Sequence, residues 1–229
     1  MGNLKIITRH EELIADRRQA AQMLNVHLAE YYGRDDVVVL GIPRGGVVLA
    51  GEIAKKLEVR LDVVLARKIG APGRPEVAIG AVCEDGHAYL NNDIMTALRV
   101  SEDYIREEKN RRFEEIEWRK KLYRSVLEKA PLKSRTVILI DDGIATGATM
   151  GAAVWICHAE QAARIVIALP VGPAESLEAL AGQADELICL CAPPAFEAVG
   201  QYYTQFEPVS DDEVIDILSG KATLSSRGL

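Results

Sequence analysis

The sequence predicts an α/β fold with a doubly wound, mostly parallel central sheet. Short, almost purely aliphatic runs alternate with longer helical stretches, as in chains built from strand–helix–strand units. These runs lack the polar alternation of a half-exposed strand, so helices should cover both faces of the sheet. A sheet of this kind binds its ligands beyond the carboxyl ends of its strands.

The predicted elements follow in chain order. The first thirty residues are expected to form a helix beside the sheet, with a stripe at helical spacing made of Leu13, Arg17, Ala20, Ala21, Leu24 and Leu28. Core strands are expected at residues 37–41, 61–66, 136–140, 164–169 and 186–190. Helices are expected at residues 46–57, 147–163 and 175–181.

Two further elements interrupt this alternation after the second core strand. An extended pair is expected at residues 77–82 and 88–90. A long, highly charged helix is expected at residues 101–127, with Ser101 as its N-cap. Its acidic and basic side chains should form a solvated face with ion pairs along the helix.

The composition fits one domain spanning residues 1–229. The chain has 27 Lys and Arg against 34 Asp and Glu, a net charge of −7. This acidic balance argues against a chain-wide electrostatic grip on nucleic acid or an anionic membrane, because such binding needs clustered Lys and Arg. The apolar runs are too short for a membrane helix and the first residues lack a signal-peptide core, so we expect a cytoplasmic protein.

The four cysteines are expected to be buried thiols that hold no metal. Three of them lie in strongly apolar segments, and Cys189 and Cys191 lack the two-residue spacing of a zinc knuckle.

The segment from Val137 to Thr149 carries the strongest functional signal. A buried strand runs into Asp141 and Asp142, which could accept hydrogen bonds from vicinal ribose hydroxyls or hold a magnesium hydration shell. The small-residue turn that follows should leave backbone N–H groups uncovered at a helix N-terminus, which favours a phosphate. A strand-ending turn with an N-cap is the ordinary alternative, and a receiver-type acidic pair is the nearest rival; neither predicts the Thr-Gly-Ala-Thr turn.

Two more segments suit an anion. In Gly41-Ile-Pro-Arg-Gly-Gly46, the glycine pair permits N–H groups to face an anion and Arg44 adds positive charge, although a glycine turn that simply precedes a helix is common. Arg67 and Lys68 enter a Gly/Pro-rich stretch at residues 69–73, expected to be a mobile loop that closes over a polyanion. Because all three motifs follow core strands, we expect them to converge on one crevice.

The run from Val137 to Thr149 closely resembles the phosphoribosyl-pyrophosphate signature of type I phosphoribosyltransferases. The resemblance implies that Asp141 and Asp142 are catalytic residues that bind the ribose 2- and 3-hydroxyls. It implies a 5-phosphate cradle made of Ala145, Thr146, Gly147, Ala148 and Thr149.

The same resemblance implies a site for the leaving pyrophosphate and its partners. The pyrophosphate loop falls on Pro43, Arg44, Gly45 and Gly46, and the further catalytic cations on Arg67 and Lys68. Magnesium is the implied cofactor, phosphoribosyl pyrophosphate the implied donor, and a homodimer the implied assembly.

Wider segments, such as IPRGGV and ARKIGAPGRPEVAIGAV, are similar to a subgroup of predicted phosphoribosyltransferases whose acceptor is unassigned. The implied reaction moves a 5-phosphoribosyl group to a nitrogenous base or other nucleophile and releases pyrophosphate. Ala145 stands where 6-oxopurine enzymes carry a proton-relaying Asp, which disfavours hypoxanthine and guanine. The alternative is a non-catalytic regulator that senses the donor or a nucleotide on the same fold.

The single domain is expected to carry two additions. Residues 70–132 should hold a flexible loop and the helical insertion, and residues 192–229 a C-terminal hood or tail. The tail aromatics Phe196, Tyr202 and Tyr203 could stack on a base, but we expect them in the core.

Overall fold

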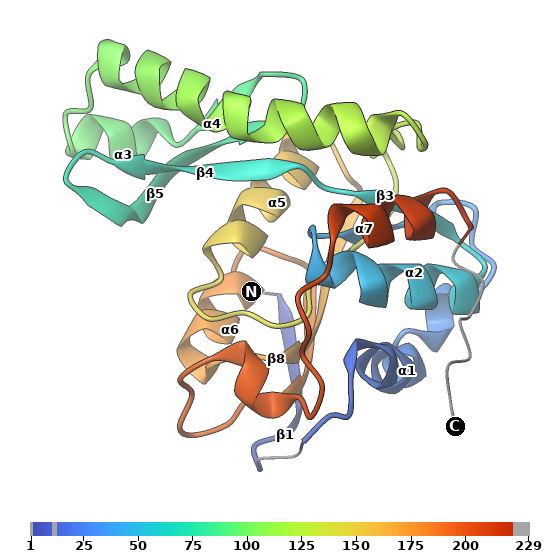
Figure 1. Ribbon diagram of the computed structural model, residues 1–229. Helices are drawn as coiled ribbons and strands as arrows, with labels where there is room; N and C mark the ends of the chain where they lie inside the picture. The colour runs from blue at the N-terminus through green and yellow to red at the C-terminus, as the bar shows by residue number, and fades with distance from the viewer. Residues whose placement is uncertain (1, 11–12, 222–229) are drawn as a thin grey trace.

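A six-stranded parallel sheet in the order β1-β9-β8-β7-β2-β3 forms the centre of the molecule (Figure 1). The computed structural model describes residues 2–10 and 13–221, apart from the side chains of Pro75, Glu76 and Asn92. The strands are β1 (Asn3–Thr8), β2 (Val37–Gly41), β3 (Arg60–Val63), β7 (Thr136–Ile140), β8 (Arg164–Val171) and β9 (Glu186–Cys191). The parallel, doubly wound sheet expected from the sequence is confirmed.

Helices cover both faces of this sheet, as its uninterrupted aliphatic strands require. The helices of the chain are α1 (Arg17–His27), α2 (Gly45–Leu57), α3 (Asn92–Ala97), α4 (Glu102–Arg124), α5 (Ala148–Ala159), α6 (Ala174–Ala181) and α7 (Asp211–Leu218), with short 3-10 turns at Ala29–Tyr31 and Val199–Tyr202. On one face α1 and α2 pack against Val39 and Ile138. On the other, α5 and α6 pack against Leu40 and Leu139.

A second, three-stranded antiparallel sheet lies above the first and, with α3 and α4, makes an upper lobe of residues 66–124 (Figure 1). Its strands are β4 (Ala66–Ala71), β5 (Arg74–Cys83) and β6 (Ala88–Leu90), in that order. The charged helix expected at residues 101–127 is α4, and the Ser101 hydroxyl accepts from the Tyr104 N–H at 3.3 Å as its N-cap.

The expected strand at residues 61–66 is correct only as far as Val63, and the Gly/Pro-rich stretch after it is not an irregular loop. β3 ends at Val63, and Ala66 begins β4 in the second sheet. Val64 and Leu65, which join the two strands, are themselves buried, so the apolar run continues across a boundary that its pattern could not reveal. The Gly/Pro-rich stretch expected to be a flexible loop is a β-hairpin built by β4 and β5.

The N-terminal helix expected over the first thirty residues is also wrong in part. Residues 3–8 form the edge strand β1, paired in parallel with β9, and the helix begins only at Arg17. The alternating burial along β1 is the two-residue period of a strand. Glu11 and Glu12 lie outside the described residues.

The C-terminal segment, expected to be a hood or tail, lies apart from the upper lobe, which residues 66–124 build. Residues 192–210 pass from the lower end of the central sheet up to α7, whose Val214 and Leu218 share a core with α2 and α4 (Figure 1). Residues 222–229 of the predicted tail lie outside the described part of the chain.

Two smaller expectations concern membranes and thiols. Within the described part of the chain, each helix is too short or too polar to cross a bilayer. The four cysteines are free and buried, which confirms that part of the sequence prediction.

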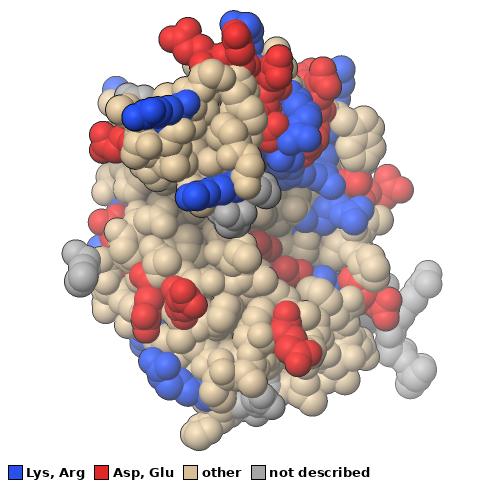
Figure 2. Space-filling model, turned by 90° about the vertical axis from the view of Figure 1, so that its left-hand side faces the viewer, with Lys and Arg blue, Asp and Glu red and all other residues tan. Residues whose placement is uncertain are grey.

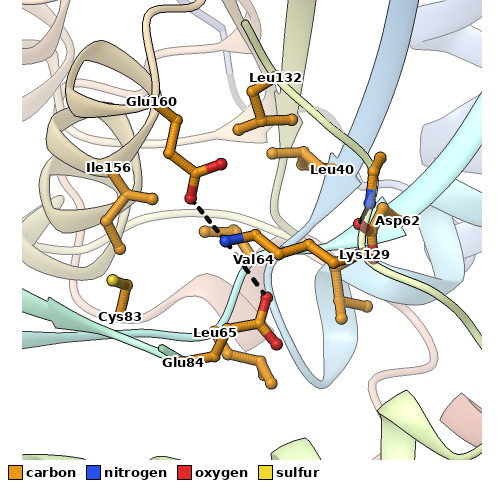
Figure 3. A pocket seen from close by; sticks show the side chains of 12 residues that line it. Leu40, Asp62, Val64, Leu65, Cys83, Glu84, Lys129, Leu132, Ile156 and Glu160 are labelled. Carbon is orange, nitrogen blue, oxygen red and sulfur yellow. Dashed lines mark hydrogen bonds and ion pairs between the residues drawn. The ribbon is translucent and has the colours of Figure 1, made fainter. Parts of the chain in front are cut away.

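A buried ion network joins the upper lobe to the central sheet. Arg124, at the end of α4, donates to Asp62 of β3 at 2.6 Å and to both carboxylate oxygens of Glu84, just after β5. Lys129 reaches Glu160 at 2.7 Å and lies 3.9 Å from Glu84, beside a small cavity (Figure 3). Since Asp62 and Glu84 are only 1% and 6% exposed, they depend on these cations for charge balance.

Replacing Arg124 by Met should therefore destabilise the fold. The change leaves two buried carboxylates without their guanidinium, and breaking such a pair costs about 3 kcal/mol or more of the free energy of unfolding. Urea unfolding followed by circular dichroism measures the loss. Arg34→Met, which breaks an exposed pair with Asp36, is the matched control and should leave the midpoint almost unchanged; equal effects of the two variants would contradict the role of the network.

Candidate active site

A hollow lies between the upper lobe and the body of the molecule (Figure 2). Acidic side chains lie at its floor, and basic side chains gather beside it on the upper lobe. Because β2 and β7 are neighbours in register, the turns that leave their carboxyl ends start at the same height. This places residues 43–46 and residues 141–149 at one edge of the sheet.

The glycine turn after β2 lies directly against the acidic pair after β7. A Cβ atom on Gly45 would lie 1.8 Å from Oδ2 of Asp142, and one on Gly46 would lie 2.8 Å from Cα of Asp141. A side chain at Gly46 would push the two turns apart, and a side chain at Gly45 would displace the Asp142 carboxylate, so the site favours glycine at both positions. The peptide bond between Pro43 and Arg44 in the same turn is cis.

The acidic pair is electrostatically unfavourable without a ligand. The backbone N–H of Asp142 donates to Oδ1 of Asp141 at 2.9 Å, which holds the two residues close together. Desolvation by the surrounding protein, followed by repulsion from Asp142, raises the pKa of Asp141 well above its ordinary value. A ligand that brings hydroxyl donors or positive charge would relieve this cost.

Arg17, the first residue of α1, is a site residue that the sequence analysis did not assign. Its Nε donates to Oδ2 of Asp142 at 2.8 Å, and its guanidinium lies 4.0 Å from the ring centroid of Phe206. One terminal nitrogen donates to the carbonyl of Glu207 at 2.8 Å, and the Tyr203 hydroxyl donates to the Asp142 carbonyl at 2.7 Å. The two ends of the chain thus fix Asp142. The sequence holds one signal for this role, because Arg17 is a charged residue within the apolar stripe of a predicted helix.

The turn before α5 has the geometry of an anion cradle. Gly147 has a φ of +71°, the left-handed region that favours glycine, and it begins the helix as its N-cap. The Ser176 hydroxyl donates to the Ala145 carbonyl at 2.8 Å, which fixes the turn from α6. Thr146 and Thr149 are exposed, and the first N–H groups of the helix have no acceptor within it.

A cavity of about 250 Å³ lies between this turn and the upper lobe. Thr146, Gly147 and Ala148 line it from below, and Lys68 of β4 lines it from above. The cavity therefore joins a cation of one lobe to a helix N-terminus of the other, an arrangement suited to an anionic ligand.

The structure separates the two cations that the sequence presents as a pair. Neighbours on a strand point to opposite faces, so Arg67 lies on the α4 side of β4, with Nε 3.3 Å from Glu115. Burial, and after it the positive charge of Arg119, lowers the pKa of Arg67. Arg44 also contacts an acid, Asp211 of α7, at 3.5 Å. The candidate pyrophosphate residues therefore come from both lobes.

The tail aromatics are mostly core, as expected. Tyr202 and Tyr203 are each 5% exposed, and Phe196 stacks on Tyr202 with ring centroids 5.6 Å apart. Tyr203 also stacks on Phe206, the ring beneath Arg17. These rings support Asp142 and Arg17 from the C-terminal side.

Comparison with known proteins agrees with this geometry. Residues 3–207 match the sequence profile of the phosphoribosyl transferase domain. The chain belongs to the phosphoribosyltransferase family. The family resemblance seen in the sequence is thereby confirmed.

Relatives of this phosphoribosyltransferase domain include proteins from two Mycobacterium tuberculosis strains, CDC 1551 and H37Rv, each named "Putative phosphoribosyl transferase". Each is 42% identical to the chain over 207 residues, which is 90% of this chain and 46% of the relative. The chain thus spans about half the length of these curated relatives. Among solved structures, the crystal structure of TT1426 from Thermus thermophilus matches with a TM-score of 0.84 and 44% identity, covering 93% of this chain and all of that one.

Replacing Asp141 by Asn should stabilise the ligand-free phosphoribosyltransferase domain at alkaline pH. Because the folded state raises the pKa of this carboxyl, the wild-type protein loses stability as pH rises from the ordinary carboxyl range through the raised value. An amide does not titrate, so the melting temperature of the variant should exceed that of the wild type by more at pH 8 than at pH 5.

Scanning calorimetry at the two pH values measures this difference. Asp35→Asn, at an exposed loop position, is the control and should show no such pH dependence. A variant that melts below the wild type by the same amount at both pH values would contradict the electrostatic account of the pair.

Proposed function

We propose that this domain transfers a 5-phosphoribosyl group from phosphoribosyl pyrophosphate to a nitrogenous base or other nucleophile, with release of pyrophosphate. The carrying observation is the contact of the Gly45 and Gly46 turn with Asp141 and Asp142 in one hollow, beside the cradle before α5. A sugar that bears a phosphate on one side and a diphosphate on the other needs these groups in this proximity.

In this proposal the sugar end of the donor binds at the β7 turn. Asp141 and Asp142 accept hydrogen bonds from the ribose 2- and 3-hydroxyls. The backbone N–H groups of residues 145–149 bind the 5-phosphate, with the N-terminus of α5 behind them. Arg17 binds Oδ2 of Asp142 and holds the carboxylate in place, which leaves Oδ1 to accept a hydrogen bond from the sugar.

The diphosphate end binds at the β2 turn and beneath the upper lobe. Backbone N–H donors of residues 44–46, together with the side chains of Arg44, Arg67 and Lys68, stabilise the negative charge that grows on the leaving pyrophosphate. The C1–O bond breaks before much of the new bond forms, so this charge and the cationic sugar are what the site must stabilise. No covalent intermediate with the protein is needed.

The residues present fit a magnesium ion that arrives with the donor. Magnesium is held through one or two carboxylates, water and substrate phosphate oxygens, and Asp141 and Asp142 supply two carboxylates beside the diphosphate position. Over the ranges that the structure describes, no cluster of three or more His, Cys, Asp or Glu forms a metal site of protein ligands alone. When bound, the ion would offset negative charge on the pyrophosphate.

We further propose a cytoplasmic location and a homodimer. The four free, buried thiols support a reducing compartment. The dimer rests on the family alone.

Donor-dependent pyrophosphate release with a panel of nucleobases tests the proposed function. Asp142→Asn should lower the rate by about 100-fold or more, because the site loses a charge that contacts the reacting sugar. Asp212→Asn, an exposed acid of α7, is the charge-matched control and should react at the wild-type rate.

The outcomes separate the two candidate functions. A wild-type rate in Asp142→Asn would contradict the role of the pair. Wild-type protein that binds the donor in calorimetry but releases no pyrophosphate with any base would favour the non-catalytic sensor on the same fold.

A further inference from the structure

One carboxylate contacts three side chains, which come from the β2 turn and from α4. Asp211, the first residue of α7, lies 3.5 Å from Arg44 of the β2 turn and 3.7 Å from Arg119 of α4. It also accepts a hydrogen bond from the Tyr123 hydroxyl, one turn further along α4. The acid thus occupies the place where the candidate pyrophosphate loop meets the upper lobe.

Asp211 carries one negative charge, whereas Arg44 and Arg119, which pair with it, carry two positive charges. Burial lowers the pKa of Arg67, and the positive charge of nearby Arg119 lowers it further. The Nε atom of Arg119 is buried, and no hydrogen-bond partner for it exists within the described structure. Arg44, Arg67 and Arg119 therefore form a cluster whose hydrogen-bonding capacity is only partly used.

This cluster gives the charged helix α4 a part in the site. The sequence predicts that its charges form a solvated face, and much of the helix does so through pairs such as Arg111 with Glu108. Arg119 departs from that pattern, because its side chain is only 25% exposed and its ion-pair partner lies on another helix. An arginine held over the pyrophosphate loop by a long helix is placed to contact a ligand bound to that loop.

We propose that Arg119 is a further pyrophosphate-binding residue, and that Asp211 is an internal anion that holds the Arg44–Arg119 site until the diphosphate displaces it. This inference rests on the proposed function and deepens it. A guanidinium matches the paired oxygens of a phosphate with two parallel hydrogen bonds. A diphosphate with its several negative charges competes well against one carboxylate for the same arginines.

The two residues should act on affinity in opposite directions. Removing Arg119 takes a cation from the diphosphate, whereas neutralising Asp211 removes its competitor. Asp211→Asn keeps the shape of the side chain and an oxygen for Tyr123, so the cluster should stay in place. A purely structural pair would weaken binding in both variants.

Calorimetric titration with inorganic pyrophosphate and Mg²⁺, and separately with ribose 5-phosphate, tests the proposal. Arg119→Met should weaken pyrophosphate binding roughly tenfold, the effect of losing one charge-assisted contact. Arg119→Lys should lie between Met and the wild type, and Asp211→Asn should bind pyrophosphate more tightly than the wild type. Ribose 5-phosphate affinity should stay unchanged in all three, since that ligand lacks the diphosphate.

Two controls carry the same charge changes on the same helices. Lys121→Met removes an exposed cation of α4, and Asp212→Asn removes an exposed acid of α7. Pyrophosphate affinities of Arg119→Met and Asp211→Asn that equal those of their controls would overturn the inference, and so would weaker binding in Asp211→Asn. Wild-type protein that binds no pyrophosphate would overturn it too.

The inference and the proposed function can fail separately. If the variants show the opposite shifts described above but no base supports pyrophosphate release from the donor, the binding site stands and the transfer reaction fails. If the wild type releases pyrophosphate and Arg119→Met matches Lys121→Met in both affinity and rate, the reaction stands and the role of Arg119 fails.

Discussion

The contact between the glycine turn after β2 and the carboxylates after β7 is the constraint on which the site depends. It arises because the two strands are adjacent and in register, with Gly41 opposite Ile140, so their turns leave the sheet side by side. At Gly46 the main chain of one turn meets the main chain of the other, which only a residue without a Cβ atom permits, and Gly45 leaves room for the Asp142 carboxylate. The result is a surface of backbone donors beside two carboxylates, which suits a ligand carrying both hydroxyls and phosphates.

The rest of the molecule positions charge around this contact. Arg124, Asp62 and Glu84 anchor the upper lobe at the β3 end, and the β4–β5 hairpin extends from that anchor over the phosphate cradle. From the other side, Arg17 and the aromatic residues of the tail fix Asp142. The buried ion network fixes the joint between the lobes. At the proposed ligand site, by contrast, burial and Asp142 raise the pKa of Asp141, and the buried Nε of Arg119 has no hydrogen-bond partner among the described residues.

Much of this arrangement is readable from the sequence, because it is local. The strands at residues 37–41 and 136–140, the glycine turn and the acidic pair each combine a buried strand with a turn whose residue types have a direct chemical meaning. The family resemblance then assigns them roles. The placement of the two turns side by side follows from the adjacency of parallel strands.

The parts that sequence reasoning misses depend on contacts between distant segments. Arg17 acts on a residue 125 positions away, and Arg119 meets its partner on α7. The break between β3 and β4 is hidden in the sequence because Val64 and Leu65, the two residues that form it, are apolar and buried. Once that break is misplaced, Arg67 and Lys68 read as one loop-borne pair, although strand geometry sends them to opposite faces of β4.

A crystal structure of the protein with phosphoribosyl pyrophosphate and Mg²⁺ tests the central claim most directly. The account predicts the 5-phosphate against residues 145–149, the ribose hydroxyls within hydrogen-bond distance of Asp141 and Asp142, and the diphosphate at the Gly45 and Gly46 turn. Donor bound elsewhere on the molecule, or a hollow that stays without donor at saturating concentration, would contradict it.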